Sequence, residues 1–276
     1  KALLLSLALF CCGLQMQAQT MTEDEIMAKL NEASALDNAK KTAEALDAFL
    51  LIGKNMEQQR TEVEHQIYVY CQAKACMCYE TLNRYEEAYL LAKKLIAGNL
   101  TEKEKKDVGH LYAVNGYLYA SSFMHGNNRQ LVKARTILEE IMPYADGKVR
   151  EYTLSKIPVS WFFEGAEYHL SQQYDKALAC YQNAQKGFME LRKTDDEISV
   201  LRHIAEIKGT LYDVIGSENA YKQALYLSRQ TGKSDAQMEI LKELWKIRKT
   251  IGDVQQAQAY AASIDSLVDA TSDLQT

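Results

Sequence analysis

The stretch from residue 161 to residue 184, WFFEGAEYHLSQQYDKALACYQNA, alternates large aromatic and small side chains. A solitary amphipathic helix needs only an apolar stripe and does not require this order. Small residues allow two helices to approach closely, and aromatic residues fill the space around such a contact. The positions concerned are Trp161, Gly165, Tyr168, Tyr174, Ala177, Tyr181 and Ala184. The stretch therefore predicts a closely packed helix pair.

Related patterns recur along the chain, and each contains an alanine that can be aligned with Ala177. These alanines are Ala88, Ala134, Ala177, Ala220 and Ala257, at intervals of 46, 43, 43 and 37 residues. Self-similarity at periods of this size predicts stacked supersecondary units, here one antiparallel helix pair per repeat. The pattern is strongest over 66–97 and 157–190, and residues 22–58 are expected to form a sixth pair at the N-terminal end.

Composition favours helices throughout. Only two prolines and 13 glycines occur in 276 residues, whereas many-stranded folds need frequent turn residues. Four segments begin with the Ser/Thr-x-x-Glu/Gln pattern that caps a helix start. These starts are Thr22, Thr101, Thr194 and Ser234. We expect Pro158 in the first turn of a helix and Pro143 near a helix end.

The repeats resemble the tetratricopeptide repeat over residues 66–266. The resemblance implies an all-α fold, a right-handed α-α superhelix (solenoid) of about five to six helix hairpins. The usual period of that family is about 34 residues, so the longer spacing here implies elongated helices or longer turns. We expect four regions: a signal peptide at 1–20, an N-terminal cap hairpin at 21–60, the repeat solenoid at 61–270 and a C-terminal tail at 271–276.

Residues 1–20 place a lysine before an apolar run of about ten residues and then a small, polar end. This order is typical of a secretory signal peptide, with cleavage expected near Ala18. It predicts a periplasmic or other extracytoplasmic location. A lipoprotein signal acylated at Cys11 or Cys12 and a buried N-terminal helix remain the alternatives.

The other cysteines are Cys71, Cys76, Cys78 and Cys180. The spacing of the first three matches no common zinc pattern, and we expect all four to pack as small apolar residues between helices. A disulfide between the first group and Cys180 stays open as an alternative.

No Gly-rich phosphate loop, nucleophile elbow or H-E-x-x-H motif occurs. The five histidines are scattered, and we expect no enzyme activity, no cofactor and no metal. The net charge of −5 gives no reason to expect nucleic-acid binding, which requires a basic surface. One alternative is a hydrolase built on a helical solenoid, for which His169, His203 and Glu206 on the inner face would be the cluster to find.

Stacked hairpins present a concave surface formed by the first helix of each pair. In the family frame, the inward positions are Tyr70, Met77, Glu80, His110, Tyr117, Phe162, His169, His203, Glu206, Asp213, Lys242, Lys246 and Lys249. The three lysines share one helix face and predict either a solvated surface or a docking site for an acidic partner or for anionic headgroups. Family members that bind peptide tails clamp the terminal carboxylate with Lys, Arg and Asn. The corresponding Asn positions hold Met77 and Tyr117, so we do not expect that activity here.

The segment LKELWKIRKTIGDVQQAQAYAASIDSLVD resembles the extracytoplasmic repeat regions of bacterial membrane-bound sensor kinases and helix-turn-helix regulators. The resemblance implies a protein or peptide ligand and a role as the input domain of a signal-transduction protein. We expect a membrane tether in a segment beyond this sequence and keep a homodimer open. The alternative is a secreted or lipid-anchored scaffold that assembles envelope proteins.

Overall fold

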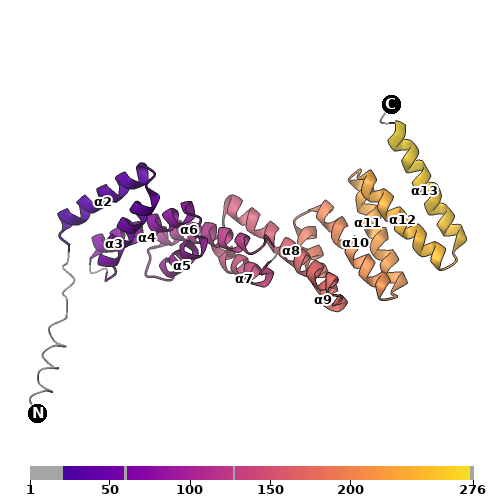
Figure 1. Cartoon of the computed structure of the whole chain (residues 1–276), viewed down its shortest axis with the longest axis horizontal. Coiled ribbons are helices and arrows are strands. Elements are labelled where there is room, and N and C mark those ends of the chain that lie inside the picture. The colour runs from indigo at the N-terminus through magenta and orange to yellow at the C-terminus, as the bar shows by residue number, and fades with distance from the viewer. Residues whose placement is uncertain (1–20, 59–60, 127, 274–276) are drawn as a thin grey trace, which may run out of the picture. The chain divides into compact units, whose positions relative to one another are not determined.

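The computed structural model describes residues 21–58, 61–126 and 128–273 (Figure 1). Within these ranges the chain forms twelve α-helices and one short 3-10 helix, η1 (Met142–Tyr144), and no strands. The predicted all-α class is therefore confirmed. The predicted signal peptide, the acylation sites Cys11 and Cys12, and residues 274–276 of the tail lie outside the described residues. None of the described helices combines the length and apolar character that crossing a membrane requires.

The chain divides into two compact units. The first holds the described residues up to Tyr119 together with Pro143–Ala145, and the second holds 120–142 and 146–273. In the first unit, α2 packs against α3, α3 against α4, and α4 against α5. The helices are α2 (Glu23–Asn38), α3 (Thr42–Asn55), α4 (Glu62–Thr81), α5 (Tyr85–Ile96) and α6 (Glu102–Ser122). The core of this unit includes the fully buried Phe49 and Ile52 of α3.

The second unit stacks each helix against the one before it and the one after it, from α7 to α13. Its helices are α7 (Leu131–Ile141), α8 (Gly147–Leu170), α9 (Tyr174–Glu190), α10 (Thr194–Thr210), α11 (Val214–Gln230), α12 (Ser234–Thr250) and α13 (Val254–Asp273). A continuous core runs from α8 to α13 and includes Tyr181, Ile207 and Leu244. Contact between successive hairpins thus buries the apolar face that each would expose alone.

From the end of α8 onward, the turns of the second unit recur at a fixed interval of twenty residues. Each contains one residue with positive φ directly after the helix C-cap: Gln172, Arg192, Tyr212, Gly232 and Gly252. A single left-handed residue reverses the chain without adding length, so each turn is three residues long. Helices α9 to α12 are 17 residues each. Over this part of the chain the long repeat spacing therefore comes from elongated helices. Earlier, a longer connection also contributes, because α6 ends at Ser122 and α7 begins only at Leu131.

This regular spacing corrects one predicted repeat anchor. Ala177 is the fourth residue of α9, and the fourth residue of α11 is Ser217, not Ala220. Ser217 is 2% exposed, and its hydroxyl donates a hydrogen bond to the Ala205 carbonyl at 2.8 Å. Because that bond satisfies the buried hydroxyl, a serine can take the place of the small apolar residue.

Two of the four predicted helix starts are confirmed. Thr22 and Thr101 each accept a hydrogen bond from the backbone N–H of the glutamate three residues later. Each glutamate carboxylate in turn accepts from the backbone N–H of its threonine. A third capping box, at Thr61, begins α4 and was not among the predictions.

The predicted caps at Thr194 and Ser234 are wrong. Both residues lie inside their helices, one position after the N-caps Lys193 and Lys233, which make no side-chain cap hydrogen bond. The three-residue turns make Lys193 and Lys233 the N-caps. Thr194 and Ser234 are therefore the first residues of their helices, where their hydroxyls do not act as caps.

Pro158 also differs from the prediction, because it lies in the interior of α8 and not in a first turn. Its ring packs against Gly187 of α9, where an added Cβ would lie 2.7 Å from the Pro158 Cβ. The absence of a side chain at Gly187 leaves room for the proline ring between the two helices. Pro143 lies in η1, directly after α7, and so stands at a helix end as expected.

The four described cysteines are buried, and no disulfide joins them. Burial raises the pKa of Cys71 and of Cys76 to about 12, and that of Cys180 to about 11. These thiols pack between helices as expected and are not activated.

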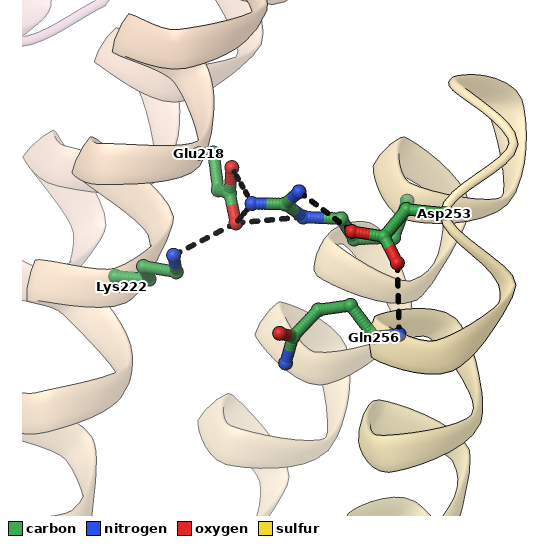
Figure 2. A network of polar contacts seen from close by, with 5 residues as sticks. Glu218, Lys222, Asp253 and Gln256 are labelled. Atoms are coloured by element: carbon green, nitrogen blue, oxygen red, sulfur yellow. Dashed lines mark hydrogen bonds and ion pairs between the residues drawn. The ribbon is translucent and has the colours of Figure 1, made fainter.

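A polar network ties α12 to both of its neighbours (Figure 2). Arg248 of α12 donates from Nε to Glu218 Oε1 of α11 at 3.0 Å, and from Nη1 to Asp253 Oδ2 at 3.0 Å. Lys222 Nζ lies 2.8 Å from Glu218 Oε1, and Asp253 Oδ1 accepts from the Gln256 backbone N–H. The network thereby joins α12 to α11 and to the turn that precedes α13.

Candidate functional site

The first unit contains a groove of about 520 Å³ between α4 and α6, the first helices of successive hairpins. Four of the predicted inward residues line it: Tyr70, Met77, Glu80 and His110. The full lining is Gln66, Val69, Tyr70, Ala73, Met77, Glu80, Glu104, Asp107, Val108, His110, Leu111 and Val114.

Large apolar side chains in this groove are exposed to solvent. Tyr70 is 45% exposed and Met77 is 52% exposed. The Tyr70 ring makes an edge contact with Phe49 of the core, with 6.2 Å between ring centroids. This contact supports the ring while nearly half of the residue stays accessible to solvent, an arrangement suited to binding an apolar group.

Acidic side chains accompany these apolar residues. Burial raises the pKa of Glu80, and neither Glu80 nor Asp107 has an ion-pair partner among the described residues. Glu104 is already engaged, since its Oε2 lies 3.1 Å from His65 Nε2 and also accepts from Thr101. The groove therefore offers two unpaired acidic groups beside an apolar surface.

A second group of predicted residues comes together in the second unit. His169 lies near the end of α8, and His203 and Glu206 lie three residues apart on α10. His203 Nδ1 is 3.1 Å from Glu206 Oε2. One nitrogen from each histidine and one oxygen of Glu206 all lie within 4.8 Å of one another.

Aromatic rings surround the two histidines. The Tyr181 ring stacks on His203 with centroids 5.3 Å apart, and Phe162 lies 5.5 Å from the same imidazole. Tyr174 makes an edge contact with His169 at 5.9 Å. These contacts restrict the orientation of both imidazole rings, as the outer shell of a ligand site does.

Electrostatics around Glu206 favour its ionised form. The hydrogen bond from His203 lowers the pKa of Glu206 and outweighs the opposing effect of burial; the charges of His203, His169 and Arg202 lower it further. Burial raises the pKa of Tyr181 to about 12, and the nearby Glu206 charge contributes. The buried Tyr181 hydroxyl has no hydrogen-bond partner among the described residues.

The remaining predicted residues do not join either group. Asp213 caps α11, where its carboxylate accepts from the Gly216 N–H at 2.8 Å. On α12, Lys246 pairs with Glu243 at 2.6 Å, and the Lys249 ammonium lies 4.6 Å from the Trp245 ring centroid. Lys242 is exposed, and Tyr117 lies on α6 outside the groove lining.

Sequence reasoning missed part of the groove. Glu104, Asp107, Leu111 and Val114 line it from α6, at spacings of three, four and three residues. That spacing places them on one helix face. The sequence signal for these residues is their spacing of three and four. It could have been used in addition to the positions of His110 and Tyr117.

The sequence matches no protein-family model and no curated protein. Among solved structures, the chain is similar to BtubC (BKLC) from P. vanneervenii: 12% identity over 84% of this chain and 92% of that chain, with a TM-score of 0.40. It is also similar to aspartyl phosphate phosphatase F from Bacillus subtilis. The identity is 11% over 93% of this chain and 77% of that chain, with a TM-score of 0.43. A third similar structure is the TPR2AB domain of yeast Sti1, solved in a complex with pHSP90. The identity is 10% over 90% of this chain and 100% of that chain, with a TM-score of 0.33. Because these identities and TM-scores are low, the functional proposal below rests on the residues of this chain alone.

Proposed function

We propose that this chain is a non-catalytic module that binds a protein or peptide segment in the groove between α4 and α6. The observation that carries this proposal is the exposure of Tyr70 and Met77 over an apolar lining. A partner side chain that covers them would remove apolar surface from water, the main source of affinity in such contacts.

The unpaired acids define the chemistry of that segment. Glu80 and Asp107 lie beside the apolar lining, so a complementary peptide carries a large apolar residue flanked by Lys or Arg. Charge complementarity of this kind mainly improves specificity and the association rate. We therefore expect binding that weakens as salt concentration rises.

The proposal extends to location and output. The pattern of residues 1–20 supports export from the cytoplasm, and the resemblance of the last helix pair to sensor input regions supports signal transduction. A fusion of residues 1–20 to alkaline phosphatase tests export, because that enzyme is active only in an oxidising compartment. The gene sequence after the codon for Thr276 distinguishes an input domain from a scaffold: a membrane span and an output domain favour the former.

A displayed peptide library, selected against the immobilised chain, tests the groove. We expect the selected peptides to combine an apolar residue with basic neighbours and to lose about tenfold in affinity when Met77 is changed to Asn. Met189→Asn is the matched control, because Met189 on α9 is 54% exposed, close to the 52% of Met77. Equal losses in both variants, or selected peptides without basic residues, would contradict the proposal.

A further inference from the structure

We propose that His169, His203 and Glu206 form a binding site for a divalent transition-metal ion of the zinc class. The site joins α8 to α10 in the second unit and is independent of the groove in the first unit. The proposal departs from the expectation, drawn from sequence, that the chain has no metal site.

The donor set is the first argument. Two imidazole nitrogens and one carboxylate oxygen are a ligand set that zinc accepts, with the fourth position left to water or to an external ligand. Imidazole donors disfavour Ca²⁺ and Mg²⁺, which prefer oxygen ligands. Among the described residues, no other group of three His, Cys, Asp or Glu side chains comes together in this way.

The distances fit a metal with little rearrangement. Tetrahedral zinc with bonds of about 2.1 Å places its ligand atoms about 3.4 Å apart. His203 Nδ1 and Glu206 Oε2 are 3.1 Å apart, and all three donor atoms lie within 4.8 Å of one another. A metal ion would therefore need to draw the His169 donor closer to the other two. Solvent can reach it, since the His203 and Glu206 side chains are 36% and 43% exposed.

The surroundings of His169 supply the second argument. This imidazole is half-buried and lies edge-on to His203, with 6.1 Å between centroids. It makes no hydrogen bond with any of the described residues. A hydrogen bond between His203 and Glu206 alone would explain that pair, but it leaves His169 without a hydrogen bond to either. A metal ion provides a shared polar partner for all three side chains.

Sequence position and packing preorganise the donors. His203 and Glu206 are three residues apart on α10 and therefore share a face, while Tyr181 and Phe162 hold the His203 ring. Arg202 lies close enough to affect Glu206, but it is paired with Glu239 at 2.6 Å. Its positive charge is thus partly offset and does not prevent cation binding.

Isothermal titration calorimetry, in which Zn²⁺ is added to the chelator-treated full chain, tests the proposal. We expect one Zn²⁺ to bind per chain. We also expect His169→Gln to lower the Zn²⁺ affinity at least tenfold, because mutating residues that merely orient metal ligands already lowers metal affinity by about 10–100-fold. His125→Gln is the control, since His125 is an exposed histidine outside both the cluster and the groove. Circular dichroism of the metal-free proteins checks that each variant is folded.

A second measurement needs no variant. X-ray absorption at the zinc edge of the wild-type complex should show two imidazoles and oxygen ligands. Sulfur ligands or a single imidazole would overturn the assignment, as would affinity in His169→Gln equal to that of the control. Failure here leaves the peptide-selection result for the groove unaffected, because the two sites share no residue.

Discussion

The Tyr181 ring lies nearly parallel to the His203 imidazole, with 5.3 Å between centroids and 8° between planes. Tyr181 is fully buried and belongs to the core that joins successive hairpins. The residue that packs the repeat thus also forms one wall of the proposed metal site. Changes in hairpin packing should therefore be transmitted to His203.

Gly165→Ala should disturb this link. A Cβ at residue 165 would lie 2.9 Å from Tyr181 Cδ1 and 3.2 Å from Cys180 Cβ, so the Tyr181 ring must shift. Overpacking of this kind costs about 1–3 kcal/mol, and we expect a lower urea midpoint and weaker Zn²⁺ binding. Glu167→Ala, on the exposed face of the same helix, is the control and should change neither quantity. An unchanged midpoint in Gly165→Ala would show that the contact is not tight.

Tyr181→Phe should leave the free energy of unfolding unchanged or raise it by up to about 1 kcal/mol, because it removes a buried hydroxyl that lacks a partner. The comparison is Tyr119→Phe, because the buried Tyr119 donates from its hydroxyl to Glu86 Oε1 at 2.6 Å. That variant should lose about 1–3 kcal/mol. Urea unfolding of both proteins measures the contrast, and a clear loss in Tyr181→Phe would indicate a partner for the hydroxyl, such as a buried water.

Arg248→Met should lower the free energy of unfolding by about 1.5–3 kcal/mol, the usual range for hydrogen bonds to charged groups. The change leaves Glu218, which is 7% exposed, without its main partner. Lys246→Met on the same helix is the control. Lys246 pairs with Glu243 at the surface, so its loss should cost less than about 1 kcal/mol. Similar losses in both variants would mean that the Arg248 network contributes no more to the free energy of unfolding than a surface ion pair does.

The same network predicts a dependence on pH. Burial opposes ionisation of Glu218, but hydrogen bonds from Arg248 and Lys222 outweigh it and lower the Glu218 pKa below its usual value of 4.5. A lowered pKa means that folding favours the ionised form. The stabilisation is therefore complete above about pH 5, where the carboxyl is ionised in the folded and the unfolded state, and it is lost as pH falls through the lowered pKa.

Glu218→Gln isolates this contribution. The difference in unfolding free energy between wild type and variant should be constant above about pH 5 and should shrink as the pH falls below the unfolded-state pKa. Urea unfolding at a series of pH values measures it. A difference that stays constant down to pH 3 would contradict the lowered pKa of Glu218.

The sequence determined the helical class and the pairing of helices, because periodic apolar and small residues dictate both locally. Gly165, Ala177 and Tyr181 already indicated the close contact, and Thr22 and Thr101 marked helix starts. It did not determine the equivalence of Ser217 with Ala177, because a serine is acceptable there only through its bond to the Ala205 carbonyl. Nor did it reveal that Pro158 lies within α8, which depends on space beside Gly187 of another helix.

The candidate sites divide in the same way. The helical frame placed Tyr70 and Met77 on one face and His203 and Glu206 on another, since residues three, four or seven apart share a face. Only tertiary packing decided which faces meet. It brought Glu104 and Asp107 of α6 opposite α4, and it carried His169 of α8 to His203 of α10 across 34 positions of sequence. Contacts between helices distant in sequence depend on how side chains fit together in three dimensions, and a single helix period does not contain that information.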